Sequence, residues 1–322
     1  MSWNASLPLL TLLTSLVTGL IIFPVPEHRH GLRNILNMTG ATVKLLFVFT
    51  MLWGVFQGHD YVLRLPLLPG NDLVLHADPL ALLFVTLSAL LWFLTTIYTI
   101  GYLRQSPNQS RFFGFFGLCV SSTVGIAMAG NLRTFFICYE LLTLTTYPLV
   151  VHRGTAVAID AGNTYLKFTL SGGVLLLVGI VWLQSLAGTV EFAVGGTLGD
   201  LPLAARPALT VIFAMFVAGL GVKAALFPLH GWLPTAMVAP APVSALLHAV
   251  AVVKAGAFGI IRMVYDVYGI SLVDDLGVGP PLAAIAAFTI IYGSLRALVQ
   301  DDLKRRLAYS TVSQLSYIVL GV

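Results

Sequence analysis

The class of fold follows from the stretch VLLLVGIVWL, residues 174–183, which is apolar on every face. A strand of a membrane barrel would instead alternate apolar and polar residues over about 10 positions. Helices that are apolar all round are typical of a buried core or a membrane span. This stretch therefore predicts a helix that crosses a lipid bilayer.

The composition of the whole chain agrees with a membrane setting. Its 322 residues are 58% hydrophobic and 9% charged, with a mean hydropathy of +0.92, whereas about a quarter of residues are charged in soluble proteins. So few charged side chains cannot cover a soluble surface, which excludes the soluble enzyme classes. The net charge is +4, and the basic residues lie between apolar runs, with no more than three in a row, so we expect no nucleic-acid partner.

Apolar runs of about 20 residues, long enough to cross a bilayer, recur along the chain. They predict an all-α polytopic membrane protein with ten transmembrane helices in a single transmembrane domain, residues 1–322. The predicted spans are Leu7–Phe23, Ile35–Phe56, Pro79–Tyr98, Phe112–Met128, Leu132–Val151, Tyr165–Leu186, Ala208–Phe227, Val243–Val264, Pro281–Leu298 and Leu307–Val322.

The orientation follows from the basic residues between these spans, because cytoplasmic loops carry an excess of Lys and Arg. With the N-terminus outside, nine basic residues fall in or near the inner loops and four in or near the outer ones. We therefore expect a multi-pass protein of a bacterial cell membrane with its N-terminus outside. The inner set is Arg29, Arg33, Arg104, Arg111, Arg153, Lys167, Lys304, Arg305 and Arg306, and the outer set is Arg64, Arg133, Arg206 and Arg262.

The sequence gives no sign of a cleaved signal peptide, a separate soluble domain or a cofactor site. The first span lacks the positive residues and the cleavage pattern of a signal peptide, so we expect it to be retained. The long connections Gln57–Asp78 and Ala187–Arg206 are expected to be packed outer loops. Cys119 and Cys138 lack metal-binding spacing, so we expect no cofactor in this chain, and any redox centre would belong to a partner.

Glu140 is the first charge that needs an explanation. It lies eight residues into its predicted span, about 12 Å along a helix, with apolar and aromatic residues on both sides. A carboxylate at that depth is costly and is usually functional. We interpret Glu140 as a carboxylate on an ion path; the alternative is a protonated glutamic acid that is hydrogen-bonded between helices.

Lys223 lies close to a predicted helix break. Pro228 lacks an amide donor and its ring clashes with the carbonyl of Ala224, four residues earlier. Free backbone groups are tolerated at membrane depth only where protein or water satisfies them, so a lysine beside a break predicts a hydrated cavity. The alternative is that Lys223 extends to the inner surface.

Lys254 and His248 share the eighth predicted span. Lys254 lies eleven residues into it, too deep to extend easily to the surface, and His248 lies six residues earlier. A histidine in this setting is about equally well explained by packing. Lys44, in the second span, is interpreted as structural or partner-facing. Carboxylate, lysine and histidine side chains on three spans are typical of groups that pass protons along a path. The sequence contains no catalytic nucleophile, phosphate loop or metal cluster that would favour an enzyme site instead.

Three stretches resemble the antiporter-like membrane subunits shared by respiratory complex I (NADH:quinone oxidoreductase), Mrp-type cation/proton antiporters and membrane-bound hydrogenases. They are GVKAALFPLHGWLP at 221–234, APVSALLH at 241–248 with VKAG at 253–256, and DDLKRRLAYSTVSQ at 301–314. The resemblance implies two inverted five-helix repeats, of which 112–264 is the first and 281–322 the start of the second. Because the last run is short, we expect the chain to be a fragment, or the family's usual remainder to be missing.

By resemblance, Glu140 modulates Lys223 on the broken helix, with the break at Pro228, and His248 and Lys254 continue the proton path. The resemblance implies a proton-translocating subunit of a complex with other membrane subunits. The transported ions would be protons, or protons and Na+. Among the family's subunits, the resemblance favours the D-type Mrp subunits. At most the chain belongs to a proton-pumping oxidoreductase of the NADH:quinone type, without a redox site of its own. The alternatives are a stand-alone secondary transporter and a non-transporting anchor of a redox enzyme.

Overall fold

The computed structural model describes residues 3–68, 71–246 and 251–322, and almost all of its regular structure is helical. The chain divides into two compact units. The first contains residues 1–130, 137–153 and 239–251, and the second contains residues 131–136, 154–238 and 252–322. Each unit is described by itself below.

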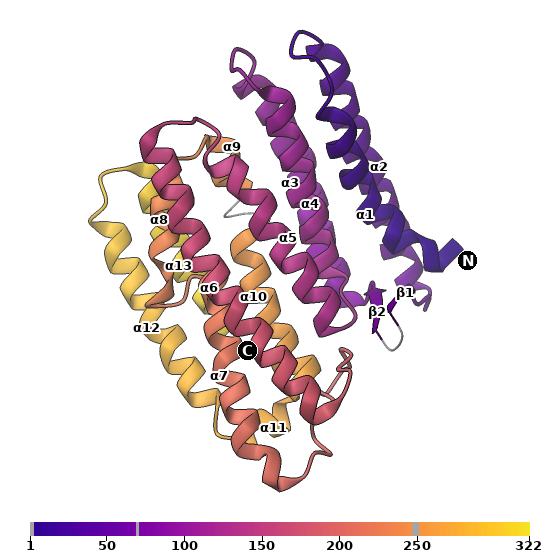
Figure 1. The fold of residues 1–322 in the computed structure, drawn as a ribbon, viewed down its shortest axis with the longest axis vertical. Helices are drawn as coiled ribbons and strands as arrows, with labels where there is room; N and C mark the ends of the chain where they lie inside the picture. Colours follow the sequence, from indigo (N-terminus) through magenta and orange to yellow (C-terminus); the bar gives the residue numbers. More distant parts are fainter. Residues whose placement is uncertain (1–2, 69–70, 247–250) are drawn as a thin grey trace. The chain divides into compact units, whose positions relative to one another are not determined.

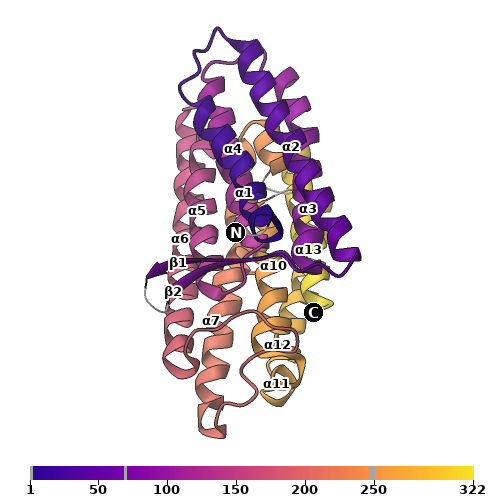
Figure 2. The same ribbon diagram turned by 90° about the vertical axis from the view of Figure 1, so that its right-hand side faces the viewer.

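The first unit is built from long helices that pack through small residues. A Cβ atom at Gly117 would come within 3.0 Å of the Cα atom of Gly19, so two of its helices meet backbone to backbone, as membrane helices often do. Figure 2 shows the long helices of this unit. They are α1 (Trp3–Ile22), α2 (His30–Phe56), α3 (Pro79–Tyr102), α4 (Gln109–Ala127) and most of α5 (Leu132–Val150), with the short α9 (Ala241–Ala245).

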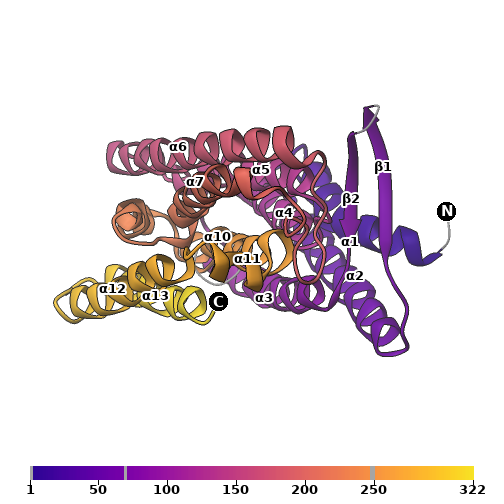
Figure 3. The same ribbon diagram turned by 90° about the horizontal axis from the view of Figure 1, so that it is seen from below.

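A two-stranded hairpin stands where a packed loop was predicted. Strands β1 (Val62–Leu68) and β2 (Asn71–His76) pair antiparallel, with Leu63 opposite Leu75 (Figure 3). Leu63 and Leu75 are buried whereas Arg64 is exposed, the alternation of a half-buried strand. The hairpin is an addition to an otherwise helical fold, and the loop reading of this connection was wrong.

The second unit holds the remaining helices (Figure 1). Its last two helices form an antiparallel hairpin, in which a hydrogen bond joins the hydroxyls of Ser294 and Ser313, 2.9 Å apart. The elements are α6 (Ala156–Ala187), η1 (Leu203–Ala205), α7 (Arg206–Ala224), η2 (Leu229–Gly231), α8 (Trp232–Thr235), η3 (Ala236–Val238), α10 (Val252–Arg262), the π-helix η5 (Met263–Tyr268), α11 (Ile270–Asp275), α12 (Gly279–Leu298) and α13 (Leu303–Leu320).

Among the described residues, seven helical segments are long and apolar enough to cross a membrane, which confirms a multi-pass helical protein. The predicted total of ten is not confirmed: α5 and α13 carry too many polar residues, and α10 is short. The predicted helix Val243–Val264 is divided. Its residues belong to α9, which ends at Ala245, and to α10 and η5, which begin at Val252 and Met263.

Candidate functional site

Lys223 lies in the last turn of α7, which ends at Ala224. Ala225 follows in the left-handed conformation (φ 57°), so the Ala225 amide donates to the Val222 carbonyl (3.2 Å) and the Leu226 amide to the Gly221 carbonyl (2.9 Å). This is a Schellman ending, formed here without the usual glycine. The Lys223 side chain is completely buried, at the helix end whose dipole favours a positive charge.

The backbone groups released by this ending are satisfied from within the second unit. The indole Nε1 of Trp232 donates to the Val222 carbonyl at 2.7 Å, and the amide of Phe227 donates to the Thr289 hydroxyl of α12 at 3.1 Å. The chain resumes a helical path at Leu229. An interruption with satisfied backbone groups is tolerated at membrane depth.

Two glycine contacts hold the end of α7 between α6 and α10. A Cβ atom at Gly219 would come within 2.7 Å of the carbonyl of Gly172 on α6. A Cβ atom at Gly256 would come within 2.2 Å of the amide nitrogen of Ala224 and 2.7 Å of the carbonyl carbon of Lys223. Lys223 is therefore buried where three helices approach at backbone distance.

Lys254 lies on the helix that makes this contact, two residues before Gly256. Its side chain is half-buried, and no acceptor binds it among the residues that the structure describes. The structure thus brings the helices of Lys223 and Lys254 together at Gly256. Lys254 lies in the first turn of α10, not deep within one long helix as the sequence predicted.

Glu140 lies near the middle of α5 and is half-buried. The neighbouring Cys138 packs on α4, where a Cβ atom at Gly125 would meet its sulfur at 2.5 Å. Glu140 belongs to the first unit and Lys223 to the second, so their coupling stays a prediction. His248 lies outside the described residues.

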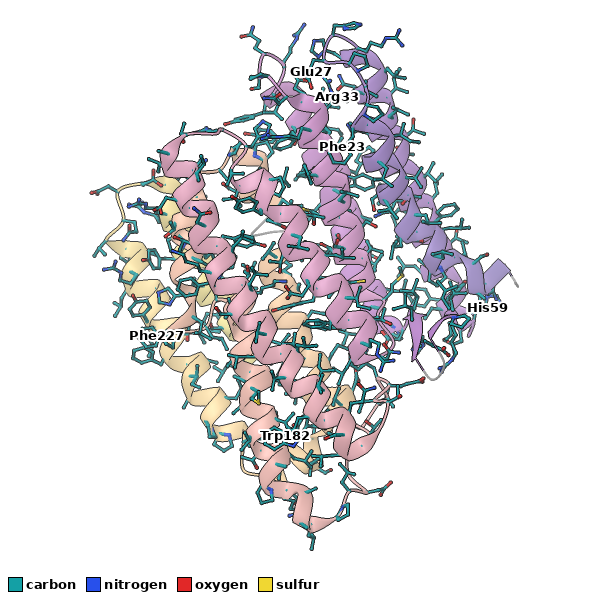
Figure 4. The ribbon with its side chains drawn as sticks, in the orientation of Figure 1. Phe23, Glu27, Arg33, His59, Trp182 and Phe227 are labelled. Carbon is teal, nitrogen blue, oxygen red and sulfur yellow. The ribbon has the colours of Figure 1, made fainter. Side chains whose placement is uncertain are left out.

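Pro228 lines a groove of about 430 Å³ in the second unit, where α7 and the segment after it face α12. Phe227, labelled in Figure 4, lines the same groove. Apart from Thr210, the lining side chains are apolar. This groove is therefore not the hydrated cavity that the sequence predicted beside Lys223.

Lys44 on α2 is completely buried. Its Nζ donates to the Ser15 hydroxyl of α1 at 2.5 Å and lies 4.8 Å from the ring centroid of Trp92 on α3. Residues on three different helices thus meet at this lysine. These contacts are those expected of a structural role, one of the two interpretations given for Lys44 above.

A polar cluster at one end of the first unit was read only as a topology signal. Arg33 is completely buried and donates to Ser110 Oγ (2.9 Å) and Gln109 Oε1 (2.6 Å). The carboxylate of Glu27 accepts from the amides of Gln109 (2.9 Å) and Ser110 (3.0 Å), so it caps the start of α4 from another segment. Figure 4 labels Glu27 and Arg33. Burial raises the pKa of Glu27, but these amides and Arg33 outweigh burial and leave that pKa below its usual value.

A buried ion pair joins α10 to the π-helix. Arg262 Nη1 donates to Asp266 Oδ2 at 2.6 Å, and the guanidinium lies over the rings of Phe258 and Phe192 at 5.1 and 5.6 Å. Both partners are nearly inaccessible. The spacing of four residues between opposite charges was a readable signal for this pair.

Comparison with known families identifies the family to which the chain belongs. Residues 129–322 match the family described as NADH:quinone oxidoreductase/Mrp antiporter, TM. The chain belongs to this family. Residues 71–113 also match the family described as NADH-ubiquinone oxidoreductase (complex I), chain 5 N-terminus.

One curated relative is similar in sequence, and two solved structures are similar in fold. The NAD(P)H-quinone oxidoreductase chain 5 of Picosynechococcus sp. is 33% identical over 98% of this chain and 49% of its own length. An archaeal membrane-bound sulfane sulfur reductase complex contains a chain with a TM-score of 0.83 and 25% identity, over 98% of this chain and 64% of that one. The Mrp complex from Dietzia sp. DQ12-45-1b contains another, with a TM-score of 0.81 and 26% identity, over 97% and 34%. The chain spans about half the length of the curated relative.

Proposed function

We propose that the chain is a proton-translocating subunit, capable of cation/proton exchange, within a membrane complex of the NADH:quinone oxidoreductase or Mrp type. The observation that carries the proposal is Lys223, completely buried at the interrupted end of α7 against the α10 helix of Lys254. A buried lysine releases its proton more readily than an exposed one, because burial disfavours the charged form. One completely buried lysine and one half-buried lysine on touching helices suit stepwise proton transfer.

The roles of the single residues follow from their chemistry. Lys223 holds a proton at its Nζ while the α7 dipole stabilises the charge. A carboxylate at Glu140 would hold that proton when it is ionised and favour its release when it is protonated, since opposite charges stabilise one another. Lys254, without an acceptor among the described side chains, would accept the proton next, with His248 as a neighbouring relay.

The assembly around the chain is part of the same proposal. Residues 112–264 would form a five-helix repeat and 281–322 the start of an inverted one. The N-terminus would lie outside a bacterial cell membrane, and other membrane subunits would provide the rest of the path and the driving reaction. Protons, and in an antiporter also Na+, would be the transported ions. The lean towards a D-type Mrp subunit stays a prediction.

The test is proton movement by the purified native complex in proteoliposomes, followed with a pH-sensitive dye. Lys223→Met removes the charge and keeps most of the apolar volume, so it should strongly reduce acidification while the complex still assembles. Lys167→Met, at an exposed position on α6, is the matched control and should retain wild-type flux. Wild-type flux in Lys223→Met would refute the proposal and favour a non-transporting anchor.

A further inference from the structure

The buried guanidinium of Arg33 joins three segments at one end of the first unit. Its Nη2 donates to Gln109 Oε1 at 2.6 Å and to Nδ1 of His30 at 2.7 Å. Gln109 in turn donates through its Nε2 to the carbonyls of Leu103 and Ser106, at 2.6 and 2.9 Å. The start of α2 is thus tied to the start of α4 and to the connection that precedes α4.

The contact between Arg33 and His30 fixes the state of the histidine ring. A guanidinium has N–H donors and no acceptor, so Nδ1 of His30 accepts the hydrogen bond and carries no proton. His30 is therefore neutral in this arrangement, with its proton on Nε2. Protonation would place an N–H on Nδ1, so that two donors and two positive charges would face each other across 2.7 Å. A protonated His30 therefore has to leave Arg33.

His30 is open to the surroundings although the group that it binds is buried. Its side chain is exposed and lines a polar hollow of about 500 Å³, together with Glu27, His28 and Arg104. Histidine is the side chain that ordinarily changes its charge between pH 5 and pH 8. Protons from water in this hollow therefore reach the ring that holds Arg33.

The charged groups around His30 act on it with opposite signs. Arg33 and Arg104 oppose a positive charge on the ring, whereas the carboxylate of Glu27, 3.7 Å from Arg33, favours one. His152 keeps its neutral form in mild acid, because burial and the nearby arginines lower its pKa to about 4. The other ionisable side chains at this end are His28, Arg29, Arg111 and Arg153.

We propose that His30 is a pH-sensitive latch of the first unit: the neutral ring holds the start of α2 against α4 through Arg33, and the protonated ring releases it. The protonated ring also competes for the Glu27 carboxylate, which otherwise accepts from the amides of Gln109 and Ser110. Mild acid on this side of the membrane therefore loosens the end at which the α1–α2 and α3–α4 connections meet. The proposal does not depend on the proton path proposed above.

The test measures the distance between the two connections at two pH values. Nitroxide spin labels are attached at Gly31→Cys and Gln105→Cys in the full chain, with Cys119 and Cys138 replaced by alanine, in lipid nanodiscs. Both labelled positions are exposed, and a Cβ atom at Gly31 meets nothing within 4 Å. Pulsed electron paramagnetic resonance then gives the distribution of distances at pH 7 and at pH 5.

The chain that keeps His30 should show one narrow distance at pH 7 and gain a longer one at pH 5. His30→Gln keeps an acceptor but takes up no proton, so it should stay narrow at both pH values. His30→Lys carries a charge and no acceptor, so it should show the longer distance already at pH 7. His28→Gln, at the same hollow, is the matched control and should respond to acid as the parent chain does.

Several results would overturn the proposal. The parent chain could show the same distances at both pH values, or His30→Lys could stay narrow at pH 7. His30→Gln could respond to acid as the parent chain does, or be loose already at pH 7. Loss of the response in His28→Gln would assign the titration to His28 and would also overturn the proposal. None of these readouts uses proton flux.

Discussion

Gly256 lies against the amide of Ala224, so close that a Cβ atom at position 256 would come within 2.2 Å of that nitrogen. The contact joins the helix of Lys254 to the end of the helix of Lys223. No flexible side chain is available to move aside, because the opposing atoms belong to the backbone. The distance between the two lysine-bearing helices therefore depends on the absence of a side chain at this position.

Gly256→Ala should push α10 away from α7 and destabilise the protein by about 1–3 kcal/mol, the usual cost of overpacking. Thermal unfolding in detergent measures the change, and proton flux should fall with it. Gly101→Ala on α3 is the control, because a Cβ atom there meets nothing within 4 Å. Equal unfolding temperatures for the two variants would show that the tight contact does not limit the packing.

Glu140→Gln should lower the number of protons moved per turnover while the complex still assembles, because the amide keeps the shape but cannot exchange a proton. If Glu140 and Lys223 act as a pair, Glu140→Gln combined with Lys223→Met should be no worse than the single lysine variant. Wild-type coupling in Glu140→Gln would favour a neutral packing acid. If the losses of proton flux in the two single variants simply added in the double variant, Glu140 and Lys223 would act independently.

Lys254→Met should reduce proton flux in the assembled complex sharply, because methionine removes the charge and keeps most of the apolar volume. Lys254→Arg should restore only part of the flux, since arginine keeps a charge but does not readily release its proton. Both are measured as dye quenching in proteoliposomes. Equal activity of Lys254→Met and wild type would leave Lys254 a structural lysine.

Lys44 and Ser15 should respond to substitution with opposite signs. Ser15→Ala removes the hydroxyl acceptor of the completely buried Lys44 Nζ and should destabilise the protein by about 1–3 kcal/mol. Lys44→Met replaces the buried charge with an apolar side chain and should leave stability unchanged or higher. Thermal unfolding of the two variants decides. Loss of proton flux in a stable Lys44→Met variant would instead assign Lys44 to the proton path.

Mild acid should destabilise the region after α5 through His152. Burial, with Arg111 and Arg153 nearby and Glu27 opposing them, lowers the pKa of His152 to about 4 from a usual 6.5. The folded state therefore binds fewer protons than the unfolded state between these values, so stability is full above pH 6.5 and falls towards pH 4. His152→Phe should remove this part of the pH dependence and keep the ring contact with Phe112. The role of His152 would be contradicted if the unfolding temperature of His152→Phe fell between pH 7 and pH 5 by as much as that of the wild type.

Runs of mainly apolar residues predicted the positions of the long helices well. The predicted span Leu132–Val151 is α5, which ends one residue earlier, because most of its residues are apolar or aromatic although Arg133, Glu140 and several threonines interrupt the run. The hairpin of β1 and β2 was not indicated in this way, because Arg64 is the only charged residue in VLRLPLL and the residues of this strand do not alternate between apolar and polar. A connection that carries acidic residues, Gly and Pro predicts a loop, and only the pairing of the two strands shows the hairpin.

The environments of single charges could not be predicted in the same way. Lys44 is bound by a residue 29 positions away, and Arg33 by residues 76 and 77 positions away. No local pattern contains those partners. The sequence located the charges, and only the packing of distant helices shows which of them are buried and bound.

The cap that Glu27 places on α4 has a consequence for the order of synthesis. The buried guanidinium of Arg33 has no partner on α4 until Gln109 has been made, 76 residues later. At about 5–20 residues per second, that interval lasts about 4–15 seconds. During this interval the buried side chain of Arg33, at the start of α2, lacks its partners on α4, so the packing of the first two helices is complete only after the start of α4 has been synthesised.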